Sequence, residues 1–202
     1  MMKDASTLRG TIVALAAIAI LGLGITSTAY GQTAGLAFRW DVSLRGYEVT
    51  GRGQVHGSVT DIVIPATHNG HPVRGIGSGA FRNQGLTSVL IPNGILEIDD
   101  DAFRGNQLTS VTIPDSVEFI GDDAFRGNQL TSVTIPDSVG FIGDNAFRGN
   151  QLTSVTIGNG VEIIGERAFF GNRLTSVSLP RHTWLGGHAN DIFGRGVTVI
   201  RR

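Results

Sequence analysis

The sequence predicts a solenoid, in which a short motif is repeated and each copy adds one turn and one short strand to a continuous parallel sheet. The first observation behind this prediction is a phenylalanine at every 22nd residue, and the second is a fixed order of apolar residues between these phenylalanines. A period of this length is typical of solenoids, in which a turn buries its apolar face only against its neighbours. The repeated phenylalanines are Phe81, Phe103, Phe125, Phe147 and Phe169.

The composition excludes several classes of protein. The 202 residues carry a formal net charge of −1, which gives no general attraction to nucleic acid or to an anionic membrane. Cysteine is absent, so the chain has no disulfides, no thiol nucleophile and no cysteine zinc site. The stability of the fold must therefore come from the stacking of its turns.

Residues 1–31 are predicted to be a secretory signal peptide. A polar start with Lys3 and Arg9 precedes an apolar run over residues 12–25, and small residues before Gln32 suit a cleavage site. This run is shorter than the roughly 20 residues of a membrane-spanning helix. An uncleaved membrane anchor is the alternative, and no later segment is predicted to span a bilayer. We expect an exported chain, either secreted, held at the cell surface or periplasmic.

Residues 32–58 are predicted to form an N-terminal β-hairpin that caps the solenoid. Phe38 and Trp40 alternate with other residues, a turn follows at residues 44–46, and alternation resumes from Tyr47. A period of two residues is typical of half-buried strands. Such a hairpin covers a sheet edge that would otherwise pair with other chains.

Each regular repeat is predicted to contain one strand, a bend and a corner. In residues 108–129 the alternation over residues 111–113 indicates a strand, which Pro114 ends because proline cannot donate to a sheet ladder. Gly127 and the following asparagine suit a tight corner before the next strand. Four regular copies of this 22-residue unit fill residues 86–173.

The repeat resembles that of a known family. The pattern L-x-x-V-x-I-P-x-x-V-x-x-I-G-x-x-A-F, found at residues 108–125, is similar to the leucine-rich repeat of BspA-like bacterial surface proteins. The resemblance covers residues 59 to about 193. It implies the α/β class and a leucine-rich-repeat solenoid of the horseshoe type, with a parallel sheet of short strands and mostly irregular or 3-10 convex segments. We expect about six turns over residues 59–195, followed by a C-terminal cap strand at residues 196–202.

Both ends of the array depart from the pattern. The strand predicted at residues 59–65 is followed by extra residues, including His68 and His71, which predict a protruding turn. The last turn loses the Ile-Gly spacing around Trp184 and reaches Phe193 two residues late. These irregular segments are where the repeats differ from one another.

The first candidate binding surface is the solvent side of the predicted sheet. Serine and threonine alternate there with apolar residues, and repetition would stack them into a flat, hydroxyl-rich face for an extended peptide or a glycan. The alternative is that small β-branched hydroxyl residues simply suit an exposed strand. The candidates are Thr109, Ser110, Thr112, Thr131, Ser132, Thr134, Thr153, Ser154 and Thr156.

The second candidate surface is an apolar column formed by Phe119, Phe141 and Ile163. The family pattern leaves this position variable, and Glu97 occupies it in the first regular turn. Exposed side chains here would mark a patch that binds a partner. Side chains folded under a loop would instead extend the core.

Acidic and basic residues also recur in register. Asp122 and Asp123 precede Arg126, and neighbouring turns repeat this order. Converging carboxylates are calcium ligands, but the glycine-spaced loops of calcium-binding motifs are missing, which favours ladders of acids and arginines that neutralise each other. The asparagines that follow, such as Asn128, are interpreted as corner residues.

Signals for catalysis are poor. His68 and His71 have a spacing found in metal sites, but the sequence offers no obvious third ligand. His182, His188 and Asp191 in the last turn do not supply one, and no Gly-x-Ser-x-Gly nucleophile elbow occurs. We therefore expect no enzyme activity, no metal and no cofactor.

The expected function is the binding of other macromolecules. Because studied BspA-like proteins act as surface adhesins, the resemblance implies adhesion to host or bacterial macromolecules by a secreted or cell-surface protein. The implied partners are proteins, such as extracellular matrix or other bacterial surface proteins, or glycans. A structural or assembly role in the bacterial periplasm or envelope, without an external ligand, is the alternative, since a fold alone does not fix a function.

Overall fold

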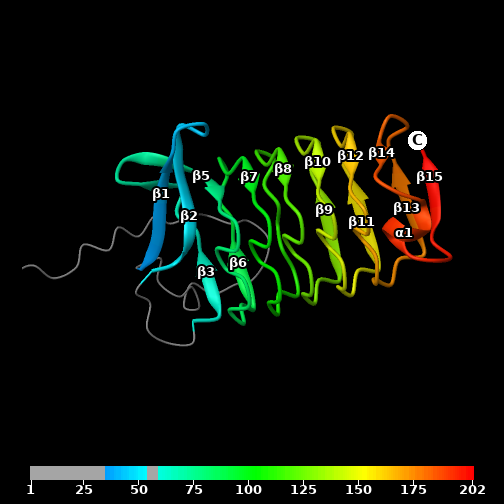
Figure 1. Ribbon diagram of the computed structural model, residues 1–202, viewed down its shortest axis with the longest axis horizontal. Coiled ribbons are helices and arrows are strands. Elements are labelled where there is room, and N and C mark those ends of the chain that lie inside the picture. Colours follow the sequence, from blue (N-terminus) through cyan, green and yellow to red (C-terminus); the bar gives the residue numbers. More distant parts are fainter. Residues whose placement is uncertain (1–34, 54–58) are drawn as a thin grey trace, which may run out of the picture.

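The structure is a computed structural model that describes residues 35–53 and 59–202. The predicted signal peptide at residues 1–31 lies outside the described residues. Within those ranges no helix combines the length and the apolar character needed to cross a membrane. The described chain winds into an elongated solenoid whose turns follow one another from β1 to β15 (Figure 1).

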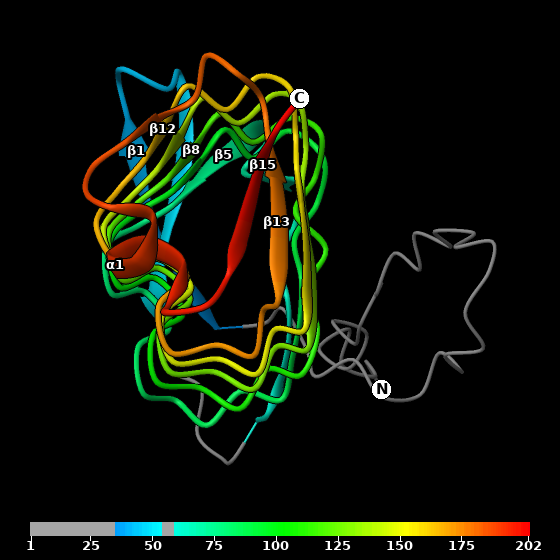
Figure 2. The same ribbon diagram turned by 90° about the vertical axis from the view of Figure 1, so that its right-hand side faces the viewer.

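The turns form flattened rings, and the strands lie on two opposite sides of these rings (Figure 2). The first wall consists of β3 (Asp61–Val63), β6 (Ser88–Leu90), β9 (Ser132–Ile135), β11 (Ser154–Ile157), β13 (Ser176–Leu179) and β15 (Thr198–Arg201). β6, β9 and β11 lie in Leu-x-x-Val-x-Ile segments, and β3, β13 and β15 lie in variants of that segment. The strands of this wall pair in parallel. Partners in β9 and β11, and in β13 and β15, are 22 residues apart in the sequence, as the period predicts.

The first wall is not the continuous sheet that was expected. It divides into the pairs β3 with β6, β9 with β11, and β13 with β15. Residues 108–113 form no strand, although the N–H of Gln107 donates to the carbonyl of Leu86 at 2.8 Å, a bond that the turns with strands also make. Residues 130–136 have the same sequence as residues 108–114 and do form a strand. The interruption therefore does not come from local propensity.

The second wall is a nine-stranded sheet that the repeat pattern did not reveal. The two-residue strands pair in parallel with the equivalent residues of the next turn, and they replace part of the irregular segment expected there. No 3-10 helix occurs in the part of the chain that is described. The strands of this wall are β1 (Leu36–Asp41), β2 (Gly46–Arg52), β4 (Thr67–His68), β5 (His71–Ile76), β7 (Glu97–Ile98), β8 (Phe119–Ile120), β10 (Phe141–Ile142), β12 (Ile163–Ile164) and β14 (Trp184–Leu185).

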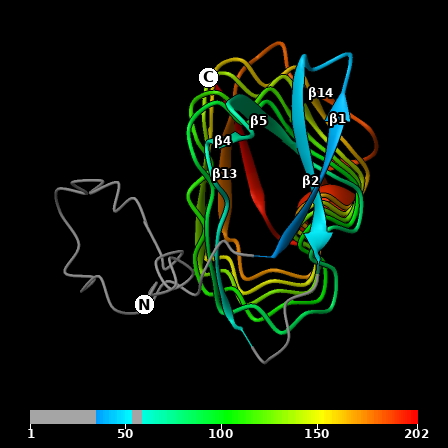
Figure 3. The ribbon, with the colours of Figure 1, turned by 90° about the vertical axis from the view of Figure 1, so that its left-hand side faces the viewer.

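The N-terminal cap is the predicted β-hairpin. Strands β1 and β2 pair in an antiparallel manner, and β2 then pairs in parallel with β5, so the hairpin extends the second wall (Figure 3). The predicted protruding turn is a second, smaller hairpin of β4 and β5. Its loop residues Asn69 and Gly70 have φ of 49° and 77°, as the tight two-residue turns that match the twist of paired strands require.

The core contains the predicted phenylalanine column as a continuous stack of rings. Successive ring centroids from Phe81 to Phe169 lie 5.2–5.4 Å apart, and the planes are nearly parallel. Phe193 continues the stack at 5.7 Å from Phe169, because the short helix α1 (Ala189–Phe193) accommodates its two extra residues. All of these rings are fully buried. The predicted solenoid fold is therefore confirmed, with about seven turns rather than about six.

The corner asparagines are buried ties between turns. The side-chain amide of Asn128 donates to the carbonyls of Phe103 and Phe125, and its oxygen accepts from the N–H of Leu108. These backbone groups would otherwise be buried without partners, which is costly. The same arrangement recurs at Asn106, Asn150 and Asn172.

Candidate binding surfaces

The nine hydroxyl residues of the first candidate surface all lie exposed on the first wall. In β9 and β11 they alternate with inward-facing apolar residues, and the register places Ser132 beside Ser154 and Thr134 beside Thr156. Thr109, Ser110 and Thr112 belong to the turn that lacks a strand, yet they are exposed as well. We call this set of nine residues the hydroxyl face.

Most of the hydroxyl groups of this face are free to bind a ligand. In the described part of the chain, Thr153 is the one member whose side chain donates a hydrogen bond, to the carbonyl of Thr131 at 3.3 Å. A hydroxyl group both donates and accepts. The face therefore offers rows of polar groups whose hydrogen-bonding capacity the fold does not use.

The apolar column lies on the outer side of the second wall. Phe119, Phe141 and Ile163 are in register in β8, β10 and β12, and each is partly buried. The rings of Phe119 and Phe141 are stacked at 5.1 Å. Trp184, which is 62% exposed, continues the column beside Ile163.

The position of Trp184 corrects the reading of the last turn. Trp184 and Leu185 form β14, which pairs with β12. Leu185-Gly186 therefore takes the place of the Ile-Gly pair of the earlier turns, and the spacing is shifted by one residue and not lost. A substitution of isoleucine by leucine hid this equivalence in the sequence.

The N-terminal end of the same wall is acidic. The carboxyl of Asp99 is half-buried, and this burial, with Glu48 and Glu97 nearby, raises its pKa to about 6. Burial also raises the pKa of Glu97, and Asp41 adds to that effect. Glu48 is itself buried and is paired with Arg39 at 2.6 Å. The second wall thus changes from acidic to apolar along the solenoid.

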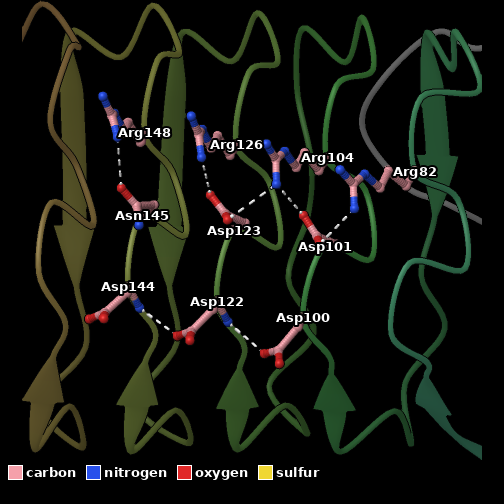
Figure 4. Close-up of polar contacts among 10 residues, drawn as sticks. All are labelled: Arg82, Asp100, Asp101, Arg104, Asp122, Asp123, Arg126, Asp144, Asn145 and Arg148. Carbon is pink, nitrogen blue, oxygen red and sulfur yellow. Dashed lines mark hydrogen bonds and ion pairs between the residues drawn. The ribbon is translucent and has the colours of Figure 1, made fainter.

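One predicted charge ladder is present on the corner that follows the second wall (Figure 4). The Arg104 guanidinium contacts Asp101 at 2.9 Å and Asp123 at 3.3 Å, and Arg126 contacts Asp123 at 3.0 Å. Asp101 and Asp123 have φ near +57°, a left-handed conformation that aspartate tolerates better than most residues. These ion pairs are partly exposed, so each adds little stability on its own.

The second acidic row has a different role from the neutralisation that was expected. The carboxylate of Asp100 accepts from the N–H of Asp122 at 2.8 Å, and that of Asp122 accepts from the N–H of Asp144 at 2.7 Å. These carboxylates join the backbones of successive turns (Figure 4). Among the residues that the structure describes, no group of three or more histidine, aspartate or glutamate side chains is arranged to hold a metal ion.

The two histidines of the protruding turn pack into an aromatic cluster of the cap. The His68 ring stacks on Phe38 with centroids 3.9 Å apart, and His71 meets the edge of Trp40 at 5.1 Å. Tyr47 contacts both histidines. Their conspicuous spacing is accounted for by this packing, since β4 and β5 place them opposite each other.

A pocket near the C-terminal end was not predicted from the sequence. It has a volume of about 350 Å³ and lies where the regular corner meets α1. The signal that identifies it is a break in two columns: Arg167 follows Asp101, Asp123 and Asn145 in one column, and Phe170 stands where the earlier turns have arginine. The lining residues are Arg148, Arg167, Phe170, Asn190, Asp191 and Arg195.

Comparison with known proteins identifies the repeat and the fold. A model of the BspA type leucine rich repeat region matches residues 74–189 with six copies. A leucine rich cell surface protein from Faecalibacterium prausnitzii A2-165 is similar in structure, with a TM-score of 0.53 and 22% sequence identity. The match covers 89% of this chain and 56% of that one.

A second solved structure is a leucine-rich repeat protein from Bacteroides ovatus ATCC 8483, with a TM-score of 0.48 and 17% identity. That match covers 83% of this chain and 66% of the other. The chain thus spans little more than half the length of the first of these structures. A search of curated protein sequences finds no match.

Proposed function

The chain belongs to the family with BspA type leucine rich repeats, and from this premise we propose that it is an exported adhesion protein that binds a macromolecular partner. The family is generally non-enzymatic, and the proposal assigns no reaction to the chain. The partner is a protein, such as an extracellular matrix or bacterial surface protein, or a glycan.

The observation that carries this proposal is the hydroxyl face of the first wall. Neighbouring parallel strands lie about 4.8 Å apart, so equivalent hydroxyls such as those of Thr134 and Thr156 form regular rows across the turns. An extended ligand that crosses the turns meets a new donor and acceptor at each one. Individually weak contacts of this kind add up over several turns.

Export is supported by the amino-terminal sequence and by the family. Residues 1–31 have the order of charges, apolar residues and small residues of a signal peptide. The similar protein from Faecalibacterium prausnitzii is described as a cell surface protein. We therefore place the adhesion role outside the cytoplasm.

The binding surface is tested with a triple variant of the hydroxyl face. Pull-down by the full chain from matrix proteins and from surface extracts of co-resident bacteria identifies the partner, and biolayer interferometry then measures affinity. Replacing Thr112, Thr134 and Thr156 by alanine removes three exposed hydroxyls without touching the core. Each lost hydrogen bond contributes about 0.5–1.5 kcal/mol, so we expect the affinity to fall at least about tenfold.

A matched variant controls for the loss of three hydroxyls. Thr50, Thr67 and Ser78 are also exposed but lie outside the hydroxyl face. Their replacement by alanine is expected to leave the affinity unchanged. Equal affinities for wild type and the hydroxyl-face variant would place the contact elsewhere, with the apolar column of Phe119, Phe141 and Ile163 as the next surface to mutate.

A structural or assembly role in the periplasm or envelope is the rival function. Antibody labelling of intact cells and release by osmotic shock separate the two. Adhesion requires that the antibody reaches the protein on intact cells. Release by osmotic shock of a protein that was inaccessible to the antibody would support the periplasmic role and reject adhesion.

A further inference from the structure

The charge ladder changes character at its C-terminal end. In the earlier turns Asp101 lies between Arg82 and Arg104, which it contacts at 3.1 and 2.9 Å. The equivalent positions in the later turns hold Asn145 and then Arg167, and both keep the left-handed conformation, with φ of 57° and 55°. An acidic column thus becomes neutral and then basic within two turns.

The arginine column is interrupted at the same place. Phe170 stands 22 residues after Arg148, where another arginine is expected, and this residue is 37% exposed. The guanidinium carbon of Arg148 lies 5.8 Å from the centroid of this ring, within the range of a cation–π contact. The Arg148 side chain donates a hydrogen bond to the neutral amide of Asn145, at 3.1 Å.

The irregular last turn completes the pocket. The helix α1 and the loop after it bring Asn190, Asp191 and Arg195 to the edge of the space beside Arg148 and Arg167. Over residues 35–53 and 59–202, no ion pair within 4.0 Å involves Asp191 or any of the three arginines of the pocket. The pocket lining therefore combines three arginines with one aspartate, one asparagine and one phenylalanine.

We propose that this arginine pocket, lined by Arg148, Arg167, Phe170, Asn190, Asp191 and Arg195, binds an acidic sugar residue of a polysaccharide, one that carries a carboxylate or sulfate group. The pocket volume of about 350 Å³ lies at the lower end of the roughly 300–1,000 Å³ of small-ligand sites. It accommodates one sugar residue, and its open side leaves room for the rest of the chain.

The chemistry of the lining selects this ligand class. Guanidinium groups bind carboxylate and sulfate oxygens with paired hydrogen bonds. The ring of Phe170 offers an apolar surface to the C–H face of a sugar. Asn190 and Asp191 accept hydrogen bonds from sugar hydroxyls, which polyphosphates do not offer.

The site is independent of the hydroxyl face. Figure 2 shows α1 beside the second wall, across the ring from β13 and β15 of the first wall. The two surfaces therefore bind their ligands separately, and the arginine pocket adds a glycan site to the proposed adhesion function. Binding of the partner by the hydroxyl face and binding of an acidic sugar by the arginine pocket are measured separately. The failure of one proposal can therefore be told from the failure of both.

The site is tested by titration calorimetry of the full-length protein at low ionic strength. The probes are a hyaluronan tetrasaccharide, which carries carboxylates, and a heparin tetrasaccharide, which adds sulfates. Neutral chitotetraose and inorganic sulfate are the comparison ligands. We expect at least one acidic tetrasaccharide to bind, with chitotetraose and sulfate at least tenfold weaker. Absence of binding by both acidic probes would overturn the proposal.

Two variants that restore the repeat sequence sharpen the test. Arg167→Asp re-creates the aspartate of the earlier turns, in a backbone conformation that suits it, and provides Arg148 with a partner. Phe170→Arg re-creates the arginine column, so it adds positive charge while removing the apolar face. We expect each change to weaken binding of the acidic tetrasaccharide at least tenfold, with unchanged circular dichroism.

Arg173→Asp is the charge-matched control. Arg173 is exposed and does not line the pocket, so its replacement is expected to change affinity less than threefold. An equal loss of affinity in Arg173→Asp and Arg167→Asp would show that only the net charge of the protein matters. Tighter binding of the acidic tetrasaccharide by Phe170→Arg would show that ionic attraction alone holds the ligand, without the apolar face of the ring. Each of these results, like displacement of the tetrasaccharide by an equal concentration of sulfate, would reject a sugar site.

Discussion

The rings of Phe125 and Phe147 lie in adjacent turns with their centroids 5.2 Å apart and their planes 8° from parallel. Each ring is fully buried and has a further phenylalanine on its other side, Phe103 or Phe169. The turns of a solenoid contact only their neighbours. This column is therefore a continuous apolar connection along the axis of a protein that has no disulfides.

Replacing Phe125 by alanine is expected to destabilise the protein strongly. The change removes a buried ring and leaves a cavity between two turns, which costs about 3–5 kcal/mol for phenylalanine. Urea unfolding followed by circular dichroism measures the loss. Phe125→Leu keeps most of the volume and is expected to cost clearly less, because cores tolerate swaps that conserve volume. Equal losses in both variants would show that filling the volume does not replace the ring, and would contradict a cost set by the cavity alone.

The buried hydrogen bonds of Asn128 are expected to contribute strongly to the free energy of unfolding, although the residue lies in a corner. Asn128→Ala removes hydrogen bonds to three backbone groups from two turns. Each buried group left without a partner costs about 1–3 kcal/mol, so we expect a loss of at least about 2 kcal/mol. Gln129→Ala, at the exposed next residue, is the control and is expected to change the unfolding free energy by less than about 0.5 kcal/mol.

The 22-residue period predicted which residues stack in columns. Strand pairing between neighbouring turns could not be predicted from the local sequence. The phenylalanine column from Phe81 to Phe169 followed from spacing alone, and Phe193 departs from that spacing by two residues. Strands of two residues, such as β8, are too short to show alternation, so the second wall was missed. Residues 108–113 and 130–135 are identical yet differ in strand pairing. The arginine pocket lies at Arg167 and Phe170, which depart from their columns. The repeat pattern makes no prediction for residues that depart from it.

Gly143 is expected to tolerate no side chain. A β-carbon at this position would lie 2.5 Å from a carboxylate oxygen of Asp122 and 2.6 Å from its backbone nitrogen. Gly143→Ala therefore has to displace the acidic row that ties the turns, and we expect a loss of about 1–3 kcal/mol. A β-carbon at Gly140 would meet nothing within 4 Å, which makes Gly140→Ala the matched control. Comparable melting temperatures of the two variants would show that the backbone moves aside without cost.

The acidic end of the second wall is expected to make stability depend on pH. Burial and the nearby Glu48 and Glu97 raise the pKa of Asp99 from 3.8 to about 6. The folded protein thus binds this proton more tightly than the unfolded chain does. The stabilisation is complete below pH 3.8 and is lost as the pH rises through about 6.

Asp99→Asn replaces the carboxyl by a group that stays neutral. Above pH 6 the variant is expected to be more stable than the wild type, by about 1 kcal/mol after allowance for solvent screening of a half-buried group. The difference should shrink as the pH falls, because the wild-type carboxyl is then protonated too. Melting temperatures measured across this pH range check the prediction, with the exposed Asp115→Asn as a control for removing a charge elsewhere. A constant difference between Asp99→Asn and wild type at every pH would show that the titration of Asp99 is not its cause.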